Sequence, residues 1–116
     1  MNNYHAGHFA EKIARWFLFF KGYRLIAQNY ITGRGTNAGE VDLIVCRGKT
    51  LVFVEVKKRS SPERAAYAVL PAQQRRIRRA AEVFLAKHPQ FKDYNIRFDA
   101  FLVCFPCRFL HLISVF

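Results

Sequence analysis

The chain has 116 residues, of which 52% are hydrophobic, and this length and composition suit one folded domain over residues 1–116 and exclude intrinsic disorder. Nineteen Lys and Arg residues against 8 Asp and Glu residues give a formal charge of +11, which favours nucleic acid or an anionic membrane surface as partner. The polar start of the chain and the absence of a long apolar run argue against a secretory signal or a membrane span. We therefore expect a cytoplasmic protein with no membrane partner.

The three cysteines form an odd set outside any secretory context, so reduced thiols are expected. Cys104 and Cys107 have the CxxC spacing of zinc and redox sites. A zinc site needs further ligands, and only Cys46 or a histidine could supply them. Pro106, between the paired cysteines, favours a turn between two strands instead.

Residues 4–21 have the pattern of a helix that ends at Gly22. The apolar stripe of this helix contains Ile13, Phe17 and Phe20 and is widened by Ala10, Ala14 and Leu18. Trp16 and Phe19 extend the apolar surface almost around the helix. Such a helix is either packed in the core, which is the commoner arrangement, or covered by a second subunit in a homodimer.

Residues 23–30 are expected to form a short strand, followed by a loop that starts at Ile31. The runs Gly39–Cys46 and Leu51–Lys57, joined at Gly48-Lys49, predict an antiparallel hairpin. A two-residue turn there sets Asp42 opposite Glu55 and Glu40 opposite Lys57. Directly opposed carboxylates repel each other in a sheet, so the first pair predicts a cation between its members.

Oxygen ligands this close suit a hard divalent ion such as Mg²⁺ or Mn²⁺. Lys57 lies two residues after Glu55 and shares its face of the strand. A lysine there can orient a nucleophilic water or stabilise developing negative charge. The pattern thus fits metal-assisted phosphodiester hydrolysis, and the alternative is a strand whose charged residues only face solvent.

Residues 71–87 predict a second helix, with Pro71 in its first turn and Pro89 beyond its end. Its apolar stripe consists of Ile77, Ala80, Ala81, Phe84 and Leu85. The opposite side is basic and, with the end of the hairpin, forms the densest positive cluster: Lys57, Lys58, Arg59, Arg75, Arg76, Arg78 and Arg79. We interpret this cluster as a phosphate-binding surface rather than an ordinary solvated face. At least one of Gln73 and Gln74 should point towards the sheet.

Residues 96–104 and 109–115 predict two further strands. Asp99 lies in an otherwise apolar strand and is either a buried, hydrogen-bonded carboxylate, the favoured reading, or a partner of the site. His111 is expected to be structural rather than a general base. The predicted order is therefore helix, strand, hairpin, helix and two strands.

Gly39-Glu-Val-Asp-Leu-Ile44 followed by Leu51-Val-Phe-Val-Glu-Val-Lys-Lys-Arg59 resembles the YraN family of bacterial proteins. Pro71-Ala-Gln-Gln-Arg-Arg76, Arg97-Phe-Asp99 and the tail from His111 extend the resemblance over most of the chain. That family is similar to the PD-(D/E)xK nucleases, especially the archaeal-type Holliday junction resolvases. The resemblance implies a restriction-endonuclease-like α/β fold, a mixed sheet flanked by helices.

The resemblance also implies a metal-dependent endonuclease acting on structured or branched DNA. Asp42 and Glu55 would bind the metal, Lys57 would act on the water or phosphate, and Glu11 would reach the site from the first helix. Glu11 could equally be a helix former paired with Arg15. Glu40 and Gln74 are expected to support the site. A nucleic-acid-binding module that does not cut is the alternative function.

Overall fold

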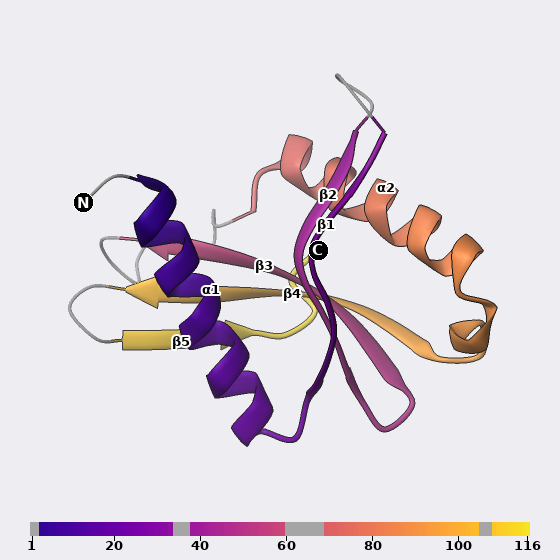
Figure 1. Cartoon of the computed structure of the whole chain (residues 1–116), viewed down its shortest axis with the longest axis horizontal. Helices are drawn as coiled ribbons and strands as arrows, with labels where there is room; N and C mark the ends of the chain where they lie inside the picture. The colour runs from indigo at the N-terminus through magenta and orange to yellow at the C-terminus, as the bar shows by residue number, and fades with distance from the viewer. Residues whose placement is uncertain (1–2, 34–37, 60–68, 105–107) are drawn as a thin grey trace.

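The computed structural model describes residues 3–33, 38–59, 69–104 and 108–116, except for the side chains of residues 3–7 and 59. The elements are α1 (Asn3–Phe20), β1 (Arg24–Thr32), β2 (Gly39–Arg47), β3 (Thr50–Arg59), α2 (Pro71–Lys87), the short 3-10 helix η3 (Pro89–Phe91), β4 (Asn95–Cys104) and β5 (Arg108–Leu112). One mixed sheet has the strand order β1-β2-β3-β4-β5, with β3 and β4 parallel and the other neighbours antiparallel. Helices α1 and α2 flank this sheet (Figure 1). The predicted α/β architecture and element order are confirmed.

The core has two layers because alternate residues of β3 point to opposite faces of the sheet. Val52 and Val54 pack in the layer under α1. Leu51 and Phe53 pack in the layer under α2, beside Phe84. Both faces of the central strand are thus buried, which explains its nearly continuous apolar sequence.

Helix α1 ends where the amides of Gly22 and Tyr23 bond back to the carbonyls of Phe19 and Leu18. Its buried stripe is Ala10, Ala14 and Leu18, with Ile13 and Phe17 partly covered. Phe20 is 77% exposed, and Trp16 and Phe19 are exposed as well. Of the two predicted alternatives, core packing is therefore wrong for these three rings, because the helix meets the sheet along one stripe only; cover by a second subunit stays a prediction.

Helix α2 has the predicted bounds, and its predicted stripe is buried except for the partly buried Leu85. Strand β1 continues through Ile31, which pairs with Glu40, so the predicted loop begins later than expected. Strand β5 ends at Leu112, before Ser114, whose positive φ of 54° interrupts an extended chain. The predicted turn at Pro106, with Cys107, lies outside the described residues. Among the described residues, no helix is both long and apolar enough to cross a membrane.

Candidate active site

A fork between β2 and β3 forms the candidate site. The two strands pair in the predicted register from Arg47–Thr50 to Leu43–Val54. Beyond this point the β1–β2 hairpin turns away from β3 (Figure 1). The Asp42 carboxylate replaces the next backbone partner, since its Oδ2 accepts the Val56 amide at 2.8 Å. Backbone pairing between β2 and β3 therefore stops at Asp42, where a side chain takes the place of the strand.

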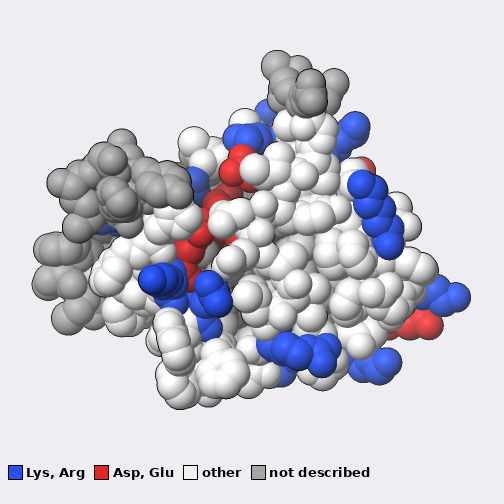
Figure 2. All heavy atoms as spheres, viewed as in Figure 1, with Lys and Arg blue, Asp and Glu red and all other residues white. Residues whose placement is uncertain are grey.

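Because the strands diverge, the predicted pair of Glu40 and Lys57 is wrong. Glu40 pairs with Ile31 of β1 rather than standing opposite Lys57 of β3. Divergence of the strands opens a cavity of about 290 Å³ instead of a continuous ladder. Its walls come from both helices and both strands: Ala10, Glu11, Glu40, Asp42, Glu55, Val56, Lys57, Lys58, Gln73 and Arg76. Acidic side chains form a band across this face of the molecule, flanked by basic ones (Figure 2).

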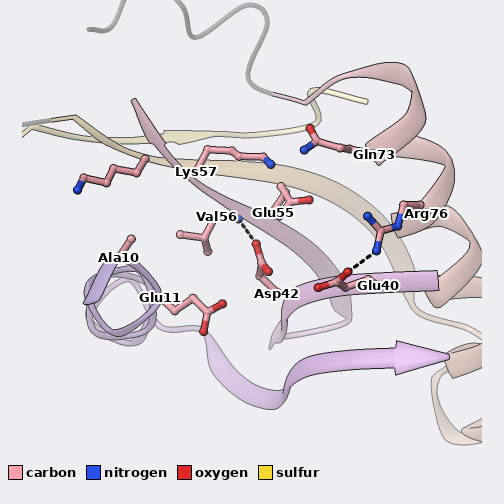
Figure 3. Close-up of a pocket in the computed structure, with 10 residues that line it drawn as sticks. Ala10, Glu11, Glu40, Asp42, Glu55, Val56, Lys57, Gln73 and Arg76 are labelled. Atoms are coloured by element: carbon pink, nitrogen blue, oxygen red, sulfur yellow. Dashed lines mark hydrogen bonds and ion pairs between the residues drawn. The ribbon is translucent and has the colours of Figure 1, made fainter. Parts of the chain in front are cut away.

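Asp42 and Glu55 converge in this cavity (Figure 3). Burial of Glu55, together with its hydrogen bond to Asp42 and the charge of that residue, raises the pKa of Glu55 to about 9, and Lys57 only partly offsets this rise. At neutral pH the pair is therefore stabilised by a proton held between the two carboxyl groups. A cation would relieve the same repulsion in place of the proton.

Glu11 enters the cavity from α1, as the resemblance implies (Figure 3). Burial and the charge of Asp42 raise the pKa of Glu11, while a hydrogen bond from the Asn29 side chain acts in the opposite direction. Arg15, the alternative partner of Glu11, instead donates to the Gln28 side chain of β1 at 3.0 Å. The structure thus places Glu11 at the site and does not form the predicted helical ion pair.

Lys57 lines the cavity from the same strand as Glu55, on the side that faces Gln73 (Figure 3). Glu55 and Lys57 are two positions apart on β3, with only Val56 between them, and this spacing directs both side chains to one face. Lys57 therefore supplies a positive charge directly beside the two carboxyl groups.

Helix α2 contributes Gln73 rather than the predicted Gln74. The Gln73 side chain lines the cavity and accepts the Leu70 amide at 3.1 Å, which also caps the helix. The Gln74 side chain instead donates to the Val69 carbonyl at 2.9 Å. Spacing could have distinguished them, because Gln73 lies near the centre of the stripe of Ile77 and Ala80, whereas Gln74 lies at its edge.

The predicted basic residues divide into two groups. Arg76 lines the cavity and forms an ion pair with Glu40, so part of its charge is already neutralised. Arg75 and Arg79 are exposed on α2 and do not line the cavity, and Lys58 is exposed at its edge. The side chain of Arg59 lies outside the described residues.

The donor set fits a hard divalent ion with few protein ligands. Two carboxyl groups that approach within hydrogen-bond contact match the one or two carboxylates, completed by water, that typically hold Mg²⁺. Among the described residues, no group of three or more His, Cys, Asp and Glu is arranged to hold a metal ion. Cys46 and Cys104 are free and buried, and Cys107 lies outside the described residues.

Asp99 and His111 belong to a separate, structural network. The fully buried Asp99 carboxylate accepts bonds from Arg97, from the His111 ring at 2.7 Å and from the Ser114 amide at 3.0 Å. Burial alone would raise the pKa of Asp99, but the bonds from His111, Arg97 and Ser114 outweigh it and hold that pKa below its ordinary value. This network ties the C-terminal residues to β4, as the favoured interpretation expected.

Asn29 is a site residue that sequence reasoning missed. It has a positive φ of 51° in β1 and contacts Glu11. Asparagine is depleted in strands and tolerates left-handed backbone better than most residues, so its presence in an otherwise strand-like run was an available signal.

The fold and site together define an α/β protein with a mixed sheet and an acidic, lysine-containing cavity at a strand fork. A family model described as "Uncharacterised protein family UPF0102" matches residues 10–103, and the chain belongs to this family, as the YraN resemblance predicted. A UPF0102 protein of Natranaerobius thermophilus is 42% identical over 125 aligned positions that cover 100% of both chains. Another, from Nitrobacter winogradskyi, is 43% identical, with 97% of this chain and 92% of the relative covered. A third, from Paramagnetospirillum magneticum, is 44% identical, with 84% and 75% covered.

Proposed function

We propose that this protein is a metal-dependent endonuclease that hydrolyses phosphodiester bonds in structured or branched DNA in the cytoplasm. The observation that carries the proposal is the convergence of Asp42 and Glu55 at the strand fork, with Lys57 beside them. Without a cation, only a shared proton offsets the repulsion between these two carboxyl groups, whereas a bound metal ion would offset it and use both groups as ligands. A nuclease uses the same arrangement to collect a cation next to a phosphate.

The residues of the cavity have separate roles in this proposal. Asp42 and Glu55 would hold Mg²⁺ or Mn²⁺, which when bound supplies a Lewis acid and a more acidic water. Lys57 orients the attacking water or stabilises the negative charge that develops on the phosphate. Glu11 faces them from α1 and assists, and Gln73 offers an amide to water or phosphate from α2.

The charge of the cavity supports hydrolysis over simple binding. Four acidic residues line it, against Lys57, Lys58 and Arg76. Arg76 is already paired with Glu40, and a cation that displaced the proton of Glu55 would add positive charge beside Lys57, where a phosphate would enter. The resemblance of the Asp42 and Glu55-Val-Lys57 pattern to the PD-(D/E)xK nucleases and archaeal-type Holliday junction resolvases also supports this function.

A non-catalytic nucleic-acid-binding module is the second candidate. The observation that favours it is that acids of the cavity already have partners without a metal ion. A proton joins Glu55 to Asp42, and an ion pair joins Glu40 to Arg76. In that case the exposed arginines of α2 would bind the phosphate backbone. The cavity residues would only stabilise the divergence of β2 from β3.

Cleavage of labelled duplex, single-stranded and four-way-junction DNA with and without Mg²⁺ or Mn²⁺ tests the proposal. We expect metal-dependent cutting that falls about 10²- to 10³-fold in Lys57→Ala, the range for loss of one charge-stabilising group. Lys92→Ala is the matched control, because it removes an exposed lysine outside the cavity. Tight binding without cutting, equal in the wild type and Lys57→Ala, would reject the nuclease and support the binding module.

A further inference from the structure

Three aromatic side chains form an exposed cluster at the C-terminal end of α1. Trp16, Phe19 and Phe20 are 62%, 63% and 77% exposed. The Trp16 ring stacks on Phe20 with centroids 6.1 Å apart and meets Phe19 edge-on at 6.5 Å. Large contiguous apolar surfaces are uncommon on soluble proteins and mark interaction sites. We call these three residues the α1 aromatic platform.

A second cavity of about 500 Å³ lies between the α1 aromatic platform and the start of β1. Trp16, Phe19 and Leu25 provide its apolar walls. Lys12 and Arg15, one turn earlier on α1, provide a basic rim. This surface therefore offers flat apolar rings and positive charge in the lining of one cavity.

The second cavity and the candidate active site lie along the same side of α1. Glu11, Arg15 and Phe19 recur every four residues and so follow one side of α1, the side that faces β1. Glu11 lines the acidic cavity and Phe19 the aromatic one, and Arg15 bridges α1 to Gln28 between them. Figure 1 shows the end of α1 leading by a short connection into β1, and Arg15 and Glu11 reach β1 through Gln28 and Asn29. Glu11 and Phe19 are eight positions apart on the helix, a rise of about 12 Å, which equals roughly three to four stacked nucleotides at 3.4 Å each.

The charge of this surface indicates its occupant. A second copy of the chain, docked symmetrically, would bring Lys12 and Arg15 near their own counterparts, and each copy carries a charge of +11. Unpaired nucleic acid complements both components, since its phosphates meet the basic rim and its bases stack on aromatic rings. Paired bases expose no free faces except at their ends and cannot use the rings in this way.

We propose that the α1 aromatic platform binds unpaired bases of a nucleic-acid strand whose backbone passes Arg15 towards the acidic cavity. The proposal rests on the proposed function and specifies its substrate: duplex or branched DNA with unpaired nucleotides a few positions from the cleaved bond. Stacking on the platform would then select such structures over continuous duplex, while the phosphate contacts act on both.

Trp16 is the single tryptophan of the chain, so its fluorescence reports directly on the platform. We would titrate the protein in EDTA with oligo-dT, blunt duplex, and the same duplex with an unpaired tail, at equal phosphate concentration. Strong quenching by oligo-dT and by the tailed duplex, and much weaker quenching by blunt duplex, whose only free base faces lie at its ends, is the expected result. Equal responses to tailed and blunt duplex would overturn the proposal.

Affinity measured with labelled DNA gives a second readout. Trp16→Leu should weaken binding of the tailed duplex about 5- to 150-fold, the effect of losing stacking with one base, and should affect blunt duplex much less. Ile96→Ala is the matched control, because it truncates an exposed apolar side chain on β4 away from α1. Equal weakening for both DNAs, or for both variants, would contradict a base-stacking role.

Other occupants of the surface give different results. A dimer detected by sedimentation, lost in Trp16→Leu while DNA binding persists, would assign the platform to a second copy and overturn the proposal. A blue shift with anionic vesicles but no response to oligo-dT would assign it to a membrane surface. Because the titration contains no metal, quenching without any later cleavage would reject only the nuclease, and cleavage without quenching would reject only the platform.

Discussion

Glu55 keeps its proton at neutral pH because burial and the neighbouring Asp42 oppose its ionisation more strongly than Lys57 favours it. Its pKa of about 9 compares with an ordinary value of 4.5. Between these values the folded chain binds more protons than the unfolded chain at this site. The stability that this carboxyl group contributes is therefore complete below about pH 4.5 and is lost as the pH rises towards 9.

Replacing Glu55 by Gln tests this ionisation. The Gln side chain can donate to Asp42 as the protonated carboxyl group does, but it does not titrate. Without metal, we expect Glu55→Gln to be at least as stable as the wild type at pH 8. In the wild type, the ionisation of Glu55 should lower the free energy of unfolding by at most about 1.4 kcal/mol for each unit that the pH rises. This dependence on pH should be absent from the variant. Urea unfolding from pH 5 to 9 measures both, and a wild-type slope that persists in the variant would contradict the assignment.

Asp99 illustrates the opposite case, a buried carboxylate that stays ionised because its partners satisfy it. Asp99→Ala leaves Arg97 and His111 without their shared acceptor, and we expect a loss of about 3 kcal/mol in the free energy of unfolding at pH 7. Since its folded pKa is lowered, this contribution exists above the ordinary carboxyl range and disappears as the pH falls below it.

Chemical denaturation at pH 7 and pH 3 measures the contribution of Asp99. Asp93→Ala removes an exposed acid in a turn and should change stability by less than about 0.5 kcal/mol. A cost for Asp99→Ala that is as small as this control, or that is the same at both pH values, would disprove the network's structural role.

At the scale of elements, the site depends on how closely α2 approaches β2. A Cβ added at Gly39 would lie 2.6 Å from the Ala80 nitrogen and 2.9 Å from its Cα, both backbone atoms of α2. Gly39 thus permits the contact that brings Gln73 and Arg76 to the cavity. The glycine is needed for packing between elements, not for the shape of its own strand.

Gly39→Ala should therefore lower the free energy of unfolding by about 1–3 kcal/mol, as overpacking does, and weaken DNA binding by displacing α2. Gly48→Ala is a matched comparison at the turn after the same strand. Its added Cβ meets nothing within 4 Å, and its φ of +60° produces only local strain, about 1 kcal/mol. Thermal unfolding and DNA affinity should separate the two variants, and equal DNA affinities would show that α2 does not shift.

At the scale of the whole molecule, the chain carries a net charge of +11, but the cavity of the candidate site is lined by acids. The residues that would attract a polyanion from a distance are therefore different from those inside the cavity. The exposed arginines of α2 can attract DNA from outside the cavity. In the proposed function, a cation bound by the acids inside the cavity would then hold the phosphate. If the protein binds nucleic acid as proposed, this division predicts that binding depends strongly on salt whether or not cleavage follows.

Removing Arg75 and Arg79 together should reduce the slope of log affinity against log salt concentration by about two, one for each phosphate contact. Lys87→Ala with Lys92→Ala removes the same charge from exposed positions at the end of α2 and beyond it. Fluorescence anisotropy from 50 to about 200 mM salt measures the slopes. The same slope in both double variants would mean that net charge, not a defined surface on α2, directs binding.

The sequence by itself determined the elements, the hairpin register and the chemical set of Asp42, Glu55 and Lys57, because period, turn residues and strand alternation act over short distances. It could not determine which side of α1 packs on the sheet or where the pairing of β2 with β3 ends. It also could not determine that Glu40 forms an ion pair with Arg76. These features depend on packing between segments far apart in the chain. Only the tertiary structure left Trp16 exposed, selected Gln73 over Gln74 and brought Glu11 to the fork, because each follows from where a helix lies on the sheet.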